Sequence, residues 1–323
     1  SMTGFTPRPA VSPTVAAAFE QHSVPTQDLE TACAGCAHLD GDELDDYPKG
    51  FDVDLDSEML GSMSAYGRQI LISTGLADWE REVTDSGLPA NIKAAYDEAS
   101  SSGSSGFLGK LAKKLKGGDS DGAVFKGVYP SSAALATPSS GTSTPSAAAP
   151  APTRLSILNA SLLSSSDSHS HQSVIILPDF KVVHQVGESK EAASELVEGY
   201  LRPAVGRAGV SLPKSVLRSW PLPYSAVVLL CSHKRRDKRC HIAAPLLLNQ
   251  FHHHLEHHGG HRYAGNVIIY LPNGTSIWYG RVTPRDIGAV VETTIMNGKV
   301  IPELLRGGLG LTEKNGPEGL LGW

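Results

Sequence analysis

The chain has 323 residues and a formal net charge of −5, with 28 Lys and Arg against 33 Asp and Glu, so no single-sign field draws it to nucleic acid or a membrane surface. No apolar stretch approaches the ~18 residues that a membrane-spanning helix needs, and the N-terminus lacks the pattern of a secretory signal. Four cysteines are too few for a disulfide scaffold, so we expect a cytoplasmic setting, or a nuclear one. The length predicts two domains, because single cores stop growing near ~250 residues.

The first half of the chain alternates between globular and low-complexity composition. We expect residues 1–30, rich in Pro, Ala and Thr, to be a flexible N-terminus, and residues 31–163 to form an N-terminal domain. Within that domain, residues 67–75 read as a buried strand that ends at a glycine turn. Residues 76–87 read as the start of a helical segment.

Low-complexity stretches interrupt this domain. Their composition predicts disordered insertions near residues 99–123 and 130–153, and residues 164–173 read as a loop between strands. Residues 107–118 place apolar side chains at helical spacing between lysines. This pattern fits a helix that touches a membrane or a partner, but a solvated basic helix is favoured because two turns bind weakly alone.

Residues 172–311 carry the clearest domain pattern. The sequence predicts strands at 173–180, 225–231, 266–271 and 276–282, with helices at 189–201, at 244–258 and from 283 onward. Thr283 is the expected N-cap of the last helix, with Pro284 in its first position. The order β-α-β-α-β-β-α predicts an α/β, thioredoxin-like layer, a central mixed sheet flanked by helices on both faces. Residues 312–323 follow as a C-terminal tail.

Two cysteines and two histidines near residue 250 form the most informative motif. Cys231 ends an apolar run, eight mostly charged residues separate it from Cys240, and His257 and His261 flank a diglycine. Two thiolates and two imidazoles can close a metal site. Zinc fingers usually space their cysteines by about two to four residues, so the wide loop and the glycines favour a 2Fe–2S cluster. The glycines either end the preceding helix or let the imidazoles stack at i, i+4.

Several neighbouring residues have competing interpretations. His258 is the residue that would replace either proposed histidine ligand, whereas residues 252–254 read as a solvated helix face. Cys33 and Cys36 form a CxxC that is a redox dithiol, half of a zinc site, or neither. Thioredoxin-type motifs follow a buried strand, and the segment before Cys33 offers no apolar strand.

The loop between the first two cysteines is basic. Its cationic residues are Lys234, Arg235, Arg236, Lys238 and Arg239. They fit docking to an acidic face of a redox partner such as a flavin reductase, because long-range attraction speeds association. Nucleic acid is the weaker interpretation, since the chain is acidic overall and no aromatic residues interleave with the basic run.

Three stretches resemble one known family. Residues 231–240 (CSHKRRDKRC), 257–274 (HHGGHRYAGNVIIYLPNG) and 278–287 (WYGRVTPRDI) look like the C-terminal domain of the sucrase/ferredoxin-like proteins. The resemblance extends to residues 33–36, 65–83 and 177–180, and so covers most of the chain outside the low-complexity stretches.

The resemblance implies two thioredoxin-like domains, the C-terminal one a thioredoxin-like ferredoxin. The implied ligands of its 2Fe–2S cluster are Cys231, Cys240, His257 and His261. The implied function is electron transfer, coupled to protons because an iron-bound imidazole keeps one titratable N–H. Such a protein is a redox carrier rather than an enzyme with its own substrate. The alternatives are a structural Cys2His2 zinc module that mediates binding, and a dithiol oxidoreductase that uses Cys33 and Cys36.

The chain ends at Trp323. A C-terminal tryptophan, as in members of the family that the chain resembles, looks like the end of the short tail by which cytosolic iron–sulfur assembly machinery recognises its client proteins. Gly322 departs from the acidic residue or serine usual before that aromatic residue, and a frayed terminus explains the tail equally well.

Overall fold

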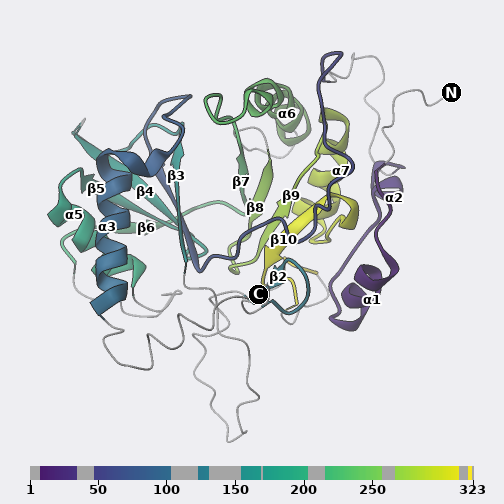
Figure 1. Ribbon diagram of the computed structural model, residues 1–323, viewed down its shortest axis with the longest axis horizontal. Coiled ribbons are helices and arrows are strands. Elements are labelled where there is room, and N and C mark those ends of the chain that lie inside the picture. Colours follow the sequence, from purple (N-terminus) through teal and green to yellow (C-terminus); the bar gives the residue numbers. More distant parts are fainter. Residues whose placement is uncertain are drawn as a thin grey trace, which may run out of the picture. The chain divides into compact units, whose positions relative to one another are not determined.

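The computed structural model divides the chain into two compact units, each with its own five-stranded sheet and core (Figure 1). The described residues are 8–34, 47–102, 123–130, 154–168, 170–202, 215–256, 266–312 and 319–321. We name the units by their place in the sequence. The terminal unit comprises Ser1–Ser64, Val124–Pro130 and Ser225–Trp323, and the central unit comprises Ala65–Ala123 and Ser131–Tyr224.

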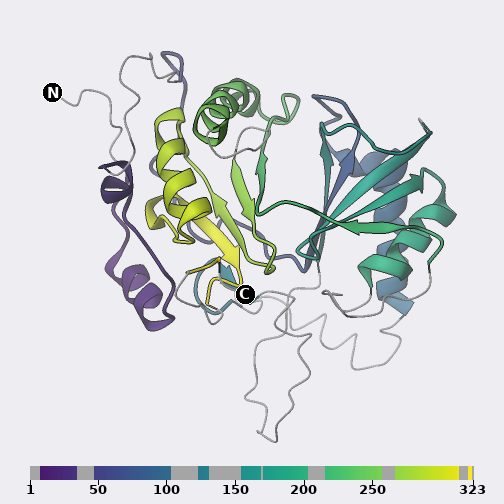
Figure 2. The ribbon, with the colours of Figure 1, turned by 180° about the vertical axis from the view of Figure 1, so that it is seen from behind.

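The central unit is built on a mixed sheet with the strand order β3-β1-β4-β5-β6. Its elements are β1 (Arg68–Ser73), a 3₁₀ turn (Val83–Asp85), α3 (Gly87–Ser102), β3 (Leu155–Ala160), β4 (His171–Leu177), β5 (Lys181–Gly187), α5 (Lys190–Leu196), a π-helical turn (Val197–Leu201) and β6 (Ser219–Pro221). β1 is parallel to β3, and the other neighbours pair antiparallel. Helices α3 and α5 lie side by side, and they bury Ile92 and Leu196 in one core with Ile70 and Ile176 of the sheet (Figures 1 and 2).

A buried ion pair ties β1 to the β4–β5 turn. Nε and Nη2 of Arg68 donate to the two carboxylate oxygens of Asp179 at 2.9 and 3.2 Å, and Nη1 donates to the carbonyl of Leu201 at 2.8 Å. Burial lowers the pKa of Lys181, and the attraction of Asp179 opposes that shift. Two of the motifs that carry the family resemblance, at 65–83 and 177–180, therefore meet in this charge cluster.

The terminal unit has the strand order β2-β10-β9-β8-β7. Its elements are α1 (Pro13–Gln21), α2 (Leu29–Ala34), β2 (Val128–Tyr129), β7 (Val227–Leu230), α6 (Lys238–Glu256), β8 (Val267–Tyr270), β9 (Ser276–Tyr279), α7 (Ile287–Ala289) and β10 (Leu305–Leu309), with 3₁₀ turns at Pro284–Asp286 and Pro302–Leu304 and a π-helical turn at Val290–Met296. Strands β7 to β10 pair antiparallel, and β2 joins β10 in parallel. Leu247 of α6 and Ile287 of α7 are fully buried with Ile269 and Ile277 of the sheet; burying such a side chain is worth ~1.5–3 kcal/mol.

The helix start predicted at Thr283 is confirmed. The N–H and hydroxyl of Thr283 donate to the carboxylate of Asp286 at 2.7 and 2.9 Å, which completes a capping box. Nη2 of Arg8 donates to the same carboxylate at 2.6 Å, and both charged side chains are only 4% exposed. A residue from the N-terminal stretch is thereby bound into the terminal unit.

The expectation of a flexible N-terminus over residues 1–30 is wrong for its described part. Ser12 accepts a hydrogen bond from the N–H of Val15 at 3.4 Å and Pro13 opens α1, so the local signals of a helix start are present. Phe19 and Leu29 are buried in the core of the terminal unit. The helix was missed because the Pro/Ala/Thr-rich composition indicated a flexible segment.

The remaining expectations are met in part. The α/β class is confirmed, but residues 173–201, expected in the C-terminal domain, belong to the central unit with β1. Residues 76–87 form only a short turn before α3, which runs into the stretch expected to be disordered from 99. Residues 107–118 lie outside the described residues, as does nearly all of 130–153. No helix in the described ranges is long and apolar enough to cross a bilayer.

Candidate functional site

The eight-residue loop between Cys231 and Cys240 folds back on itself. Cys231 follows β7 directly, and its N–H still donates to the carbonyl of Asn266 at 3.3 Å. The N–H groups of Arg236 and Asp237 both donate to the carbonyl of His233, at 3.2 and 3.0 Å, and form a tight turn. This turn brings the two cysteine side chains into hydrogen-bonding contact.

Helix α6 begins earlier than the sequence indicated. Asp237 accepts a hydrogen bond from the N–H of Arg239 at 2.9 Å, as an N-cap does, so the helix starts at Lys238 rather than at 244. Pro245 therefore lies inside the helix instead of in its first turn. The consequence for the site is that Cys240 occupies the first turn of a helix, where the helix dipole favours negative charge.

The two thiols differ in acidity, and Cys231 loses its proton far more readily than Cys240. The pKa of Cys231 is lowered to about 6, chiefly because Cys240 donates a hydrogen bond to its sulfur; burial opposes the shift, and the N–H and charge of His233 and the charge of Arg236 assist it. The pKa of Cys240 is raised, because its S–H is held by Cys231 and because it is partly buried. At neutral pH the pair therefore carries a thiolate on Cys231 and a proton on Cys240.

A cavity of about 400 Å³ opens beside Cys240 within the terminal unit. Its walls include Tyr47, Asn266, Gly280 and Arg306. The aliphatic part of the Arg306 side chain packs directly on Gly280. A Cβ added to that glycine would come within 2.6 Å of Cδ of the arginine. Burial lowers the pKa of Arg306, and the charge of the two cysteines opposes this shift, so the guanidinium lies within electrostatic reach of both sulfurs.

The structure brings together only part of the predicted ligand set. His257 and His261 lie outside the described residues, as does His258. In the part of the chain that the structure describes, no group of three or more His, Cys, Asp or Glu side chains could hold a metal ion. Cys33 is half-buried in α2 beside the core, and Cys36 and Trp323 are not among the described residues.

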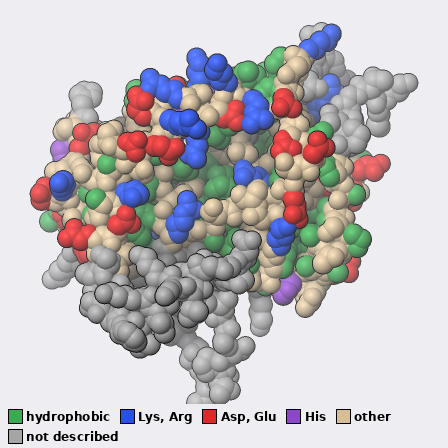
Figure 3. All heavy atoms as spheres, in the orientation of Figure 1, with side chains coloured by type: hydrophobic (Ala, Val, Ile, Leu, Met, Phe, Trp, Pro, Cys, Tyr) green, Lys and Arg blue, Asp and Glu red, His purple; other side chains and the backbone are tan. Residues whose placement is uncertain are grey.

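The basic loop is exposed, as expected of a docking surface. Lys234, Arg235, Arg236, Lys238 and Arg239 all lie at the surface. Figure 3 shows Lys and Arg side chains, with carboxylates among them, along the upper rim of the face drawn. Arg239 is engaged within the chain: its guanidinium binds the carboxylate of Asp237 at 2.9 Å.

Sequence reasoning missed the arginines around the cavity. Arg281 lies in the loop after β9 and Arg306 in β10, and both contact residues 54–62, far away along the chain. The alternation of acidic residues in residues 51–58 (FDVDLDSE) was the available signal, but it carried no indication of its partners.

Comparisons with known proteins agree on one family. The family model described as sucrase/ferredoxin-like matches residues 59–307, which include the thiol pair. The chain is 33% identical over 175 residues to "Altered inheritance of mitochondria protein 32" of Clavispora lusitaniae, covering 46% of this chain and 63% of that protein. It is 42% identical over 95 residues to the protein of that name from Debaryomyces hansenii, covering 25% of this chain and 35% of that one.

A differently named relative matches a similar length of chain. Identity to "Actin patches distal protein 1" of Saccharomyces cerevisiae is 40% over 94 residues, covering 22% of this chain and 30% of that protein. The matches thus span less than two thirds of the length of each of these relatives. No solved structure matches the chain.

These findings correct the expected function. A match to this family gives no evidence of an iron–sulfur electron carrier, the relatives' names mention no such role, and the described residues contain no complete metal-binding group. The prediction of an iron–sulfur electron carrier therefore has no support. Its two alternatives involve residues outside the described ranges, His257 and His261 for a Cys2His2 zinc group and Cys36 for the dithiol, so they stay predictions.

Proposed function

The chain belongs to the sucrase/ferredoxin-like family, and from that premise we propose that Cys231 and Cys240 are the sulfur donors of a soft-metal binding site in the terminal unit. One observation carries the proposal: two thiols nine positions apart are held in hydrogen-bonding contact, half-buried, at the junction of β7 and α6. Thiolates in such an arrangement are ligands for soft and borderline cations.

The charges at the pair favour a bound cation. Both sulfurs cannot easily be anionic side by side, and the raised pKa of Cys240 expresses that repulsion together with the hydrogen bond. A metal ion removes the conflict, because it replaces the shared proton and neutralises both thiolates. Before a metal binds, the positive charge of Arg306 and the dipole of the first turn of α6 partly offset the negative charge of the thiolate.

The 2Fe–2S cluster stays a prediction of the cofactor, separate from any electron-carrying role. The contact between Cys231 and Cys240 fits two of its ligands, since such clusters are held by thiolates, in some proteins with two imidazoles. His257 and His261, the other two ligands expected, lie outside the described residues. Their part in the site rests on the resemblance alone.

We propose further that both units are thioredoxin-like. The order β1-α3-β3-β4-β5-α5, with β1 parallel to β3 and the later strands antiparallel, supports this for the central unit. For the terminal unit the support is the order of elements alone, β7-α6-β8-β9-α7, since β7 and β8 pair antiparallel and β10 and β2 extend the sheet.

We also propose a location and a partner for the protein. We place the protein in the cytoplasm, and the relatives' names associate those proteins with mitochondrial inheritance and actin patches. Fractionation of cells that express the tagged chain separates cytoplasmic from mitochondrial protein. Deletion of Trp323 tests recognition by cytosolic iron–sulfur assembly machinery. If that machinery binds the C-terminal tail, the deletion lowers cofactor loading in cells.

Elemental analysis tests the proposed site. Anaerobically purified protein is assayed for iron, zinc and acid-labile sulfide, alongside Cys231→Ser, Cys240→Ser and the control Cys33→Ser. We expect about one equivalent of zinc, or two of iron with two of sulfide, to be lost in the first two variants and kept in the third. Metal-free wild-type protein, or metal retained in both site variants, would overturn the proposal.

A further inference from the structure

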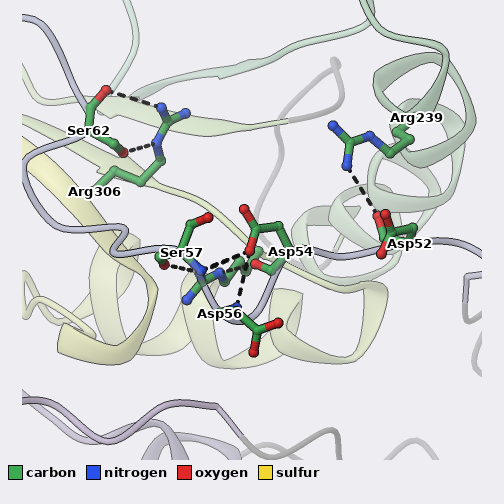
Figure 4. A network of polar contacts seen from close by, with 8 residues as sticks. Asp52, Asp54, Asp56, Ser57, Ser62, Arg239 and Arg306 are labelled. Atoms are coloured by element: carbon green, nitrogen blue, oxygen red, sulfur yellow. Dashed lines mark hydrogen bonds and ion pairs between the residues drawn. The ribbon is translucent and has the colours of Figure 1, made fainter.

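Residues 51–58, which we call the acidic segment, form neither helix nor strand, yet three arginines from three different elements hold them and their continuation to Ser62 in place. Arg239 comes from α6, Arg281 from the loop after β9, and Arg306 from β10. All three line the cavity beside Cys240, and most residues of the acidic segment line it too. Figure 4 shows this network.

The arginines bind the main chain of the segment and its continuation. Arg239 donates to the carbonyl of Asp52 at 3.5 Å. Arg281, whose side chain is only 9% exposed, donates to the carbonyls of Asp54 and Ser57. Arg306 donates to the hydroxyl and the carbonyl of Ser62, at 3.0 and 3.4 Å. Most of these charge-assisted hydrogen bonds go to main-chain carbonyls, so they hold the chain without requiring particular side chains at those positions.

Charge complementarity adds to these contacts. The carboxylate of Asp54 lies 4.0 Å from Arg281, and Glu58 pairs with Lys126. The pKa of Asp54 is lowered, chiefly by the hydrogen bonds of the Ser57 hydroxyl and N–H, with the charge of Arg281 as a smaller cause. Its Oδ1 also accepts from the N–H of Asp56 at 3.1 Å, which shapes the middle of the segment as a turn.

The segment is anchored at both ends and lightly packed between them. Before it, the hydroxyl of Tyr47 donates to the carbonyl of Val282 at 2.7 Å, and after it the N–H of Gly61 donates to the carbonyl of Arg306 at 2.8 Å. Phe51, at the start of the segment, stacks on Tyr47 and packs against the core, and no side chain of residues 52–58 is buried. Residues 52–58 therefore open locally at low cost while the rest of the unit stays folded.

We infer that Arg239 and Arg281 form a docking surface for an acidic peptide segment, and that the chain's own acidic segment occupies it as an autoinhibitory cover over the cavity beside Cys240. Opening the segment frees the guanidinium group of Arg281, releases the contact of Arg239 with Asp52 and uncovers that cavity, while Arg306 keeps its contacts with Ser62. The inference does not require that the thiols bind a metal.

Hydrogen–deuterium exchange of the full chain tests the cover. In Arg281→Gln the amides of residues 51–58 should exchange at least about tenfold faster than in wild type, because two charge-assisted hydrogen bonds are lost. The matched control Asp97→Asn removes an exposed ion pair of the central unit, 3.2 Å long, and should leave that exchange unchanged. Equal protection in Arg281→Gln and wild type would overturn the cover.

A second variant tests the docking surface without touching an arginine. Residues 52–57 are replaced by alternating Gly and Ser, which removes no buried side chain, and the melting temperature checks the fold. A synthetic peptide of residues 51–58 should bind this variant, more weakly as salt is raised, and should not bind wild type. A peptide with Asn and Gln in place of Asp and Glu should bind at least several-fold more weakly. Failure of the acidic peptide to bind a folded variant would overturn the docking surface, whatever the metal analysis gives.

Discussion

Replacing Cys240 with alanine should return Cys231 to the behaviour of an ordinary thiol. The hydrogen bond from Cys240 is the largest cause that lowers the pKa of Cys231 from 9.0 to about 6. With that pKa, about nine tenths of Cys231 is thiolate at pH 7, and with a pKa near 9 about one hundredth is. Because the thiolate is the reactive form, alkylation of Cys231 at pH 7 should slow by at least about tenfold in Cys240→Ala.

The assay is the iodoacetamide alkylation rate of metal-free protein from pH 4.5 to 9.5, read by mass spectrometry of the peptide that contains residue 231. In wild type the rate should rise with pH and be half-maximal near pH 6, since deprotonation occurs as pH passes the pKa upward. In Cys240→Ala the curve should move to higher pH, while Cys33→Ala leaves it in place. A wild-type midpoint near 9, or a curve that Cys240→Ala does not move, would refute the reasoning.

Two further predictions concern stability. Asp179→Asn should lower the free energy of unfolding by ~3–5 kcal/mol in urea denaturation, because it removes the buried negative charge that faces both Arg68 and Lys181. The exposed Asp97→Asn should change it by less than ~1 kcal/mol, and similar costs for both would contradict a buried ion pair. Gly280→Ala should cost ~1–3 kcal/mol, since its new methyl group would displace the stem of Arg306, and a neutral substitution would show that the arginine moves freely.

The local structure was largely predictable where a single short stretch determines it. The apolar runs at 67–75, 173–180 and 225–231 became β1, β4 and β7, and Thr283 capped its helix as predicted. The sequence signals were sufficient because burial of an apolar run and capping by a side chain act over a few residues.

Pairing between distant strands was not predictable from the same signals. Strand β4 joins β1 across a long stretch of chain, so the two units interleave in the sequence rather than follow one another. The early start of α6 was missed because the charged run before Cys240 was interpreted as a surface loop along its whole length, although Asp237 is a good N-cap.

The candidate site was predictable at its sulfurs and not around them. Cys231 and Cys240 were singled out by residue type and spacing, and the structure places them in contact. Arg281 and Arg306 were missed because their role depends on chain segments more than two hundred residues away, which composition and periodicity do not reveal. The acidic alternation of residues 51–58 was visible, but its partners were not.

X-ray absorption spectroscopy at the edge of whatever metal the purified protein contains tests the central claim most directly. The account predicts sulfur scatterers at about 2.3 Å from the metal, reduced in number in Cys231→Ser and in Cys240→Ser and unchanged in Cys33→Ser. A coordination shell of oxygen and nitrogen alone, or a sulfur shell that survives the loss of both cysteines, would contradict it.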